Sequence, residues 1–185
     1  MFHSLANRLT ASRIAVIPVI LLLLAIHHAW SAWVALVLFV AAGITDWLDG
    51  YIARRDHQVS MIGQFLDPIA DKLLVAAVIL LLVYSRQIDG FAVIPAVIIL
   101  LREVAVSGLR EFLAGVRVSV PVSQLAKWKT FIQIVALSFL IIGDRYTVDA
   151  IPATFIGDLL LWIAGMLTLF TAWDYWHVSQ KHFRD

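Results

Sequence analysis

Four aspartates between positions 46 and 71 have the spacing of a site for metal or phosphate chemistry. Asp46 and Asp49 are three residues apart, and Asp67 and Asp71 are four residues apart. Residues at these separations share one face of an α-helix, so each pair predicts a helix that presents two carboxylates on the same side. The same faces carry three small residues, Gly50, Ala53 and Gly63.

Carboxylates that are grouped in a low-dielectric site repel one another, and a divalent cation relieves that repulsion. All-oxygen ligands suit Mg²⁺ or Mn²⁺, and four carboxylates could hold two ions. The alternative is that single aspartates pair with Arg54, Arg55 or Lys72. Such pairs account for one or two aspartates but not for four in register. Charge inside a membrane span also indicates function, so we favour the metal site.

A second group of candidate residues is basic. Arg102 and Arg110 are eight residues apart and fall on roughly one helical face, and Lys127 opens the next apolar segment. Arginine side chains match the geometry of phosphate, so we expect these three residues to bind the phosphate of an acceptor. The alternative is an ordinary basic flank that attracts anionic lipid headgroups, which we favour for Arg117 and Lys129.

Together the two groups predict a reaction class. Paired metals held by carboxylates stabilise the attacking and the leaving oxygens of an in-line phosphoryl displacement. A separate basic patch would hold an anionic acceptor.

Long apolar runs must position these residues. The chain has 185 residues, of which 62% are hydrophobic, and its mean hydropathy is +0.90. This composition predicts one all-α integral membrane domain over residues 1–185. Because cysteine is absent, disulfides and thiolate metal sites are excluded. A short interfacial segment at residues 2–7 is expected before six transmembrane helices, at about 14–29, 31–54, 67–84, 91–113, 122–142 and 156–178.

The distribution of basic residues predicts the orientation of these helices. With six spans, 12 of the 14 Lys and Arg residues fall on one side, and only Arg86 and Arg145 fall on the other. The basic side is cytoplasmic by the positive-inside rule. Both termini and the acidic motif are therefore expected on the cytoplasmic side.

The acidic pattern D-x-x-D-G-x-x-A-R-x8-G-x3-D-x3-D resembles the signature of the CDP-alcohol phosphotransferase family. Eight fixed positions make this a specific match. The resemblance implies six transmembrane helices around a cytoplasm-facing site, and transfer of a phosphatidyl group from a CDP-linked donor to an alcohol with release of CMP. The matching positions are Asp46, Asp49, Gly50, Ala53, Arg54, Gly63, Asp67 and Asp71.

The resemblance also implies roles for these residues. Asp46, Asp49 and Asp67 would hold the metals. Asp71 would deprotonate the acceptor hydroxyl and could also touch the second metal. The nucleotide of the CDP-lipid would lie against Asn7, Asp49, Gly50, Ala53, Arg54 and Gly63.

The basic segments between positions 101 and 133 are similar to those of family members that transfer from CDP-diacylglycerol to sn-glycerol 3-phosphate. This similarity implies a homodimer in the bacterial inner membrane, in contact with membrane lipids and not with nucleic acid. Two alternatives stay open. One is another enzyme of the family, such as a cardiolipin or inositol-phosphate-using synthase. The other is a cation transporter, which is disfavoured because the acids gather at one end and no repeat is visible.

Overall fold

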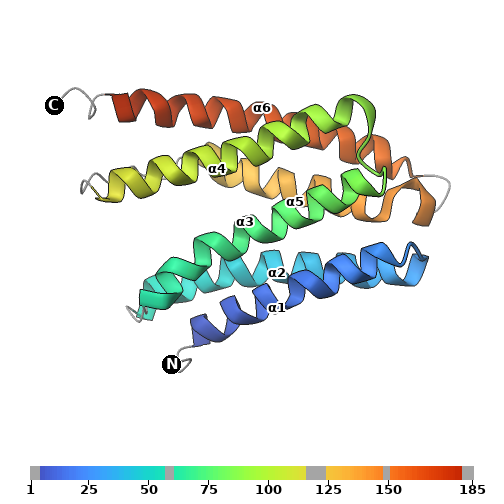
Figure 1. Ribbon diagram of the computed structural model, residues 1–185, viewed down its shortest axis with the longest axis horizontal. Coiled ribbons are helices and arrows are strands. Elements are labelled where there is room, and N and C mark those ends of the chain that lie inside the picture. Colours follow the sequence, from blue (N-terminus) through green and yellow to red (C-terminus); the bar gives the residue numbers. More distant parts are fainter. Residues whose placement is uncertain (1–4, 57–60, 116–123, 148–150, 181–185) are drawn as a thin grey trace.

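The computed structural model describes the backbone of residues 5–56, 61–115, 124–147 and 151–180. Within these ranges, the side chains of residues 5–11, 46–56, 61–68, 71, 114 and 178–180 lie outside the description. The described residues form six α-helices and one short 3₁₀-helix (Figure 1). These are α1 (Leu5–Ala25), α2 (Ala29–Asp56), α3 (Met61–Tyr84), η1 (Gly90–Ala92), α4 (Val93–Gly115), α5 (Gln124–Tyr146) and α6 (Ala153–Gln180).

The predicted all-helical class is confirmed, but two helices begin earlier than expected. α1 is already helical at Leu5, so residues 5–7 belong to the same helix as the first expected span, and residues 2–4 of the expected interfacial segment lie outside the described residues. The residues that follow include Leu, Ala and Arg, which favour helix, and glycine and proline are absent before Pro18. α3 begins at Met61, which places Pro68 inside the helix and not in its first turn. Neighbouring helices make an internal proline tolerable in membrane proteins.

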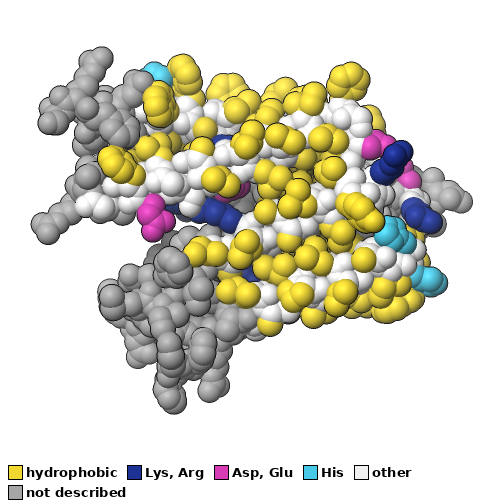
Figure 2. Space-filling model, viewed as in Figure 1, with side chains coloured by type: hydrophobic (Ala, Val, Ile, Leu, Met, Phe, Trp, Pro, Cys, Tyr) yellow, Lys and Arg dark blue, Asp and Glu magenta, His cyan; other side chains and the backbone are white. Residues whose placement is uncertain are grey.

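The chain is a membrane protein with candidate transmembrane helices. Three segments of the described chain are long and apolar enough to cross a membrane: Gly90–Leu113, Gln124–Tyr146 and Ala153–His177. Shorter apolar stretches occupy α1, α2 and α3. Figure 2 shows hydrophobic side chains over most of the visible face, as expected for a surface that meets lipid.

The helices run antiparallel to their neighbours in sequence (Figure 1). α1 packs against α2 and α3, while α6 packs against α4 and α5. Contacts between α2 and α5 join these two groups. The core between them includes Phe39, Ile79, Leu137, Leu140 and Leu161, which are buried.

This arrangement brings functional segments to the same end of the molecule. The last turns of α2, α4 and α6 lie at one end together with the first turns of α1, α3 and α5 (Figure 1). The acidic motif spans the end of α2 and the start of α3. Arg102 lies near the middle of α4 and Arg110 in its second half, while Lys127 and Lys129 lie in the first half of α5. The two predicted groups therefore share one end of the bundle.

Candidate active site

The acidic residues of the predicted site lie on two helices near that shared end. α2 is helical through Asp46 and Asp49, and α3 is helical through Asp67 and Asp71. The helical register on which the prediction depends is therefore present in the backbone. The four aspartate side chains lie outside the described residues, so their geometry as ligands stays a prediction. Among the described side chains, to which these aspartates do not belong, no group of three or more His, Cys, Asp or Glu residues could hold a metal ion.

The residues predicted to contact the nucleotide come from three helices. Gly50, Ala53 and Arg54 follow the first two aspartates on α2, and Gly63 lies on the first turn of α3. α1 carries Asn7 near its beginning. These positions belong to the last turns of α2 and the first turns of α1 and α3, and these parts of the three helices lie at one end of the bundle (Figure 1).

A polar cavity opens between α3, α4, α5 and α6 in the part of the chain that the structure describes. Its volume is about 220 Å³. The lining residues of α3, α4 and α5 recur at helical spacing, so each of these helices contributes one face, and α6 contributes Tyr175. Its described lining residues are Lys72, Val75, Arg102, Glu103, Val106, Arg110, Ala126, Lys129, Thr130, Gln133, Ile134 and Tyr175.

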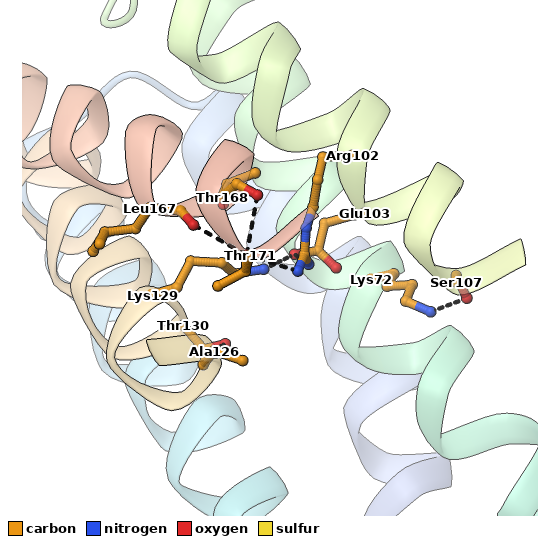
Figure 3. A network of polar contacts seen from close by, with 10 residues as sticks. All are labelled: Lys72, Arg102, Glu103, Ser107, Ala126, Lys129, Thr130, Leu167, Thr168 and Thr171. Atoms are coloured by element: carbon orange, nitrogen blue, oxygen red, sulfur yellow. Dashed lines mark hydrogen bonds and ion pairs between the residues drawn. The ribbon is translucent and has the colours of Figure 1, made fainter. Parts of the chain in front are cut away.

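Arg102 is held in this wall by contacts from two helices (Figure 3). The residue is 9% exposed. Its Nη2 donates to Thr171 Oγ1 of α6 at 3.0 Å, and its Nη1 lies 3.4 Å from Glu103 Oε1. The Thr171 hydroxyl is oriented in turn by the carbonyl oxygens of Leu167 and Thr168, each at 3.0 Å. α6 therefore fixes the guanidinium before any ligand binds.

Glu103 balances two of the cavity's cations. Its Oε1 pairs with Lys129 Nζ of α5 in addition to Arg102 (Figure 3). Lys129 is 3% exposed, so its ammonium depends on this partner for compensation. Glu103 thereby joins α4 to α5 at the cavity.

Lys72 connects the cavity to the acidic motif. Its Nζ bonds Ser107 Oγ, which links α3 to α4 (Figure 3). Lys72 directly follows Asp71 in the sequence. Lys72, which lines the cavity, is therefore the residue directly after Asp71, the predicted general base.

The charge of the cavity suits an anionic ligand. Its described wall carries four cations, Lys72, Arg102, Arg110 and Lys129, and a single carboxylate, Glu103. The resulting excess of three positive charges would offset a phosphate monoester, which carries about −1.5 to −2 near pH 7. A neutral ligand would not match this excess of positive charge.

Comparison with known proteins adds independent information to this geometry. The family model described as CDP-alcohol phosphatidyltransferase matches residues 3–170. The chain belongs to this family. A Rickettsia bellii protein is 49% identical over 181 residues, which cover 98% of each chain. A Bacillus subtilis protein is 37% identical over 95% of this chain and 94% of its own, and a Shigella flexneri protein is 35% identical over 100% of both.

These three relatives share the name CDP-diacylglycerol–glycerol-3-phosphate 3-phosphatidyltransferase. The family that the acidic pattern resembled is thus confirmed. The matches also extend over nearly the whole chain, so the basic cavity lies within the aligned region.

The structure of this CDP-alcohol phosphatidyltransferase places the basic residues differently from the sequence prediction at one helix. Arg102 and Arg110 line the cavity, whereas Lys127 is exposed and absent from its described lining, and the binding of the acceptor phosphate by these residues stays a prediction. Lys129, interpreted from sequence as a lipid-facing flank, lies in the wall instead. Two residues along a helix correspond to a rotation of about 200°, so Lys127 and Lys129 cannot share a face.

Sequence reasoning gave no role in the acceptor site to Lys72, Glu103, Gln133 or Tyr175, which also line the cavity. The spacing of residues in the sequence indicated part of this wall. Lys129 and Gln133 are four residues apart, as are Arg102 and Val106. Tyr175 offered no such signal, because its approach to the cavity depends on how α6 packs.

Proposed function

We infer that this chain transfers the phosphatidyl group of CDP-diacylglycerol to sn-glycerol 3-phosphate and releases CMP. The observation that carries this inference is the cavity whose described wall holds four cations. One of these cations, Lys72, directly follows Asp71 in the sequence. Relatives that match this chain over nearly their full length, and that share the name of an enzyme with this activity, support it. An uncharged acceptor would give no reason for so many cations.

The donor atoms of the acidic motif fit a divalent cation. Asp46, Asp49, Asp67 and Asp71 lie on continuous helices at one end of the bundle and offer only carboxylate oxygens, which Mg²⁺ and Mn²⁺ prefer. We assign these four residues to two such ions. When bound, the ions would neutralise the pyrophosphate of the CDP-lipid and the charge that develops on it.

Asp71 acts as the general base in this proposal. Its carboxylate takes the proton of the acceptor's primary hydroxyl, and the freed oxygen attacks the phosphorus that bears the diacylglycerol. The bond from that phosphorus to the bridging oxygen breaks, and CMP leaves with the electron pair. A base beside the phosphate-binding wall would keep hydroxyl and phosphate in one small site.

The remaining residues bind the two substrates. Gly50, Ala53 and Gly63 leave space for the cytidine nucleotide, because they carry little or no side chain. Asn7, Asp49 and Arg54 contact that nucleotide. The acceptor phosphate lies against Arg102, Arg110, Lys72 and Lys129, and Lys127 is left out of the set because it lies outside the cavity wall.

The setting of the enzyme follows from its charge distribution. We place it in the bacterial inner membrane with six spans, and with both termini and the active site facing the cytoplasm. Support comes from Arg86 and Arg145, which lie at the end of the bundle opposite the basic cavity. We propose a homodimer as the assembly, which light scattering in detergent would test.

An acceptor panel tests the function directly. Purified protein in detergent receives CDP-diacylglycerol, Mg²⁺ or Mn²⁺, and one acceptor: glycerol 3-phosphate, inositol phosphate, serine or phosphatidylglycerol. Metal-dependent CMP release with glycerol 3-phosphate alone is expected. Asp71→Asn should abolish release while CDP-diacylglycerol still binds, because the change removes the base. Release with another acceptor, but not with glycerol 3-phosphate, would contradict the assignment.

A further inference from the structure

Gln133 differs from the other residues of the described cavity wall because its carboxamide oxygen, a hydrogen-bond acceptor, is buried without a described partner. The residue is 3% exposed and belongs to the cavity wall. Among the described residues, its Oε1 atom is buried and has no hydrogen-bond partner. Native proteins pair nearly all buried polar atoms, so an atom without a partner in a polar cavity indicates a group that binds there.

The other polar groups of the wall are mainly donors. Lysine and arginine side chains donate hydrogen bonds and accept none, so the four cations suit the oxygens of a phosphate. They cannot accept the hydrogen of a hydroxyl group. Glu103 could accept one through its Oε2, while its Oε1 faces Lys129 and Arg102. The Thr130 hydroxyl donates to the Ala126 carbonyl oxygen at 3.1 Å and belongs to an exposed residue, whereas the Gln133 acceptor is buried.

The position of Gln133 fits a small phosphorylated polyol. It lies four residues beyond Lys129 on the same face of α5, which corresponds to a rise of about 6 Å along the helix. A three-carbon chain can bridge such a separation. If its phosphate contacts Lys129 and its primary hydroxyl contacts Asp71, the secondary hydroxyl is left for Gln133.

We propose that Gln133 is a specificity-determining residue whose carboxamide binds the secondary hydroxyl of the acceptor. This inference rests on the proposed function. It concerns the secondary hydroxyl of the acceptor, whose hydrogen the lysine and arginine side chains of the wall cannot accept. A carboxamide accepts through Oε1 and donates through Nε2, so it can satisfy both roles of a hydroxyl. The enzyme then recognises a polyol phosphate, and not merely a phosphate ester with a free primary hydroxyl.

The test compares two acceptors that differ only at this hydroxyl: glycerol 3-phosphate and 3-hydroxypropyl phosphate. Both carry the phosphate and the reacting primary hydroxyl. For the unchanged enzyme, kcat/KM should be roughly ten- to a hundredfold higher with glycerol 3-phosphate, the range expected for one buried hydrogen bond. In Gln133→Leu, the two acceptors should differ by less than about threefold, while the value for 3-hydroxypropyl phosphate is kept within a similar factor.

Two further variants keep the test decisive. Gln133→Glu retains an acceptor oxygen at the same reach and should keep a preference for glycerol 3-phosphate even if Gln133→Leu fails to fold. Ser138→Ala changes another polar residue of α5, which is absent from the described cavity lining and whose hydroxyl donates to the Ile134 carbonyl oxygen at 2.8 Å. It should leave the preference unchanged.

Three results would overturn the proposal. One is equal use of both acceptors by the unchanged enzyme, and another is a Gln133→Leu variant that loses activity equally with both. A Gln133→Glu variant without any preference would do the same. CMP release with neither acceptor would instead refute the proposed function itself, and this inference with it, so the two failures are distinguishable.

Discussion

Glu103 shows how a single residue can hold a cationic site together before substrate arrives. It is the one carboxylate in the described wall of the cavity, and its side chain is 20% exposed. Its Oε1 faces both Arg102 and Lys129, which are buried. Without it, two buried cations would face one another across α4 and α5, since a charge in such surroundings requires a partner. We therefore regard Glu103 as a positioning residue and not as a ligand of the phosphate.

Replacing Glu103 with Gln should lower both stability and acceptor binding. Removing one partner of a buried ion pair costs about 3–5 kcal/mol, and the partial exposure of Glu103 places the expected loss at the low end of that range. Thermal unfolding in detergent and the KM for glycerol 3-phosphate measure the two effects. Glu111→Gln is the control, because Glu111 is exposed on the same helix. Equal Tm values for the two variants would contradict the role of Glu103.

At the scale of elements, close packing of α6 against its neighbours determines where the cavity wall lies. A Cβ at Gly165 would lie 3.0 Å from Pro95 Cβ of α4, and one at Gly43 of α2 would lie 3.3 Å from Ile134 Cδ1 of α5. Gly43 and Gly165 therefore allow close packing between helices. Gly157 is tighter still, since its Cβ would lie 2.6 Å from Leu140 Cγ and 3.3 Å from the Ala136 carbonyl oxygen.

A methyl group at Gly157 should loosen the α5–α6 pair. Gly157→Ala is expected to destabilise the protein by about 1–3 kcal/mol, because Leu140 must leave its rotamer or α6 must move. Gly108→Ala is the matched control: it lies on α4, where an added Cβ meets nothing within 4 Å. The control should be neutral or gain up to about 1 kcal/mol from helix propensity. A lower Tm for Gly108→Ala than for Gly157→Ala would refute this account of the packing.

At the scale of the whole molecule, charge and apolar length together define an orientation. α4 has 23 residues, so it measures about 34 Å and can cross a bilayer core of about 30 Å. Asp89 lies just before this helix begins, and Gly115 is its last residue. Both residues are exposed. The basic cavity lies toward the Gly115 end.

A labelling experiment can test this orientation because the chain contains no cysteine. Asp89→Cys and Gly115→Cys each introduce one thiol at opposite ends of α4. In intact cells, a membrane-impermeant maleimide should label Asp89→Cys and spare Gly115→Cys. After the cells are opened, both should react. Labelling of Gly115→Cys in intact cells would contradict this orientation and indicate the opposite one.

The sequence alone predicts the class, the helices and the end at which the site lies, because apolar length and basic asymmetry are local properties of the chain. It misses the starts of α1 and α3, since hydropathy detects the apolar part of a helix and not its polar extension. It also favours Lys127 over Lys129. That choice depends on how α5 is rotated toward α4, which tertiary packing decides and no single segment encodes. The Glu103 contact depends on the same rotation.

The most direct test of the account is a paired measurement on Arg110 and Lys127. Both are exposed cations, but Arg110 lines the basic cavity and Lys127 does not. Arg110→Gln should raise the KM for glycerol 3-phosphate about tenfold, the loss expected for one charge-assisted hydrogen bond, and leave the KM for CDP-diacylglycerol unchanged. Lys127→Gln should leave both values unchanged. An effect of Lys127→Gln alone, or no effect of Arg110→Gln, would contradict the assignment of the cavity to the acceptor phosphate.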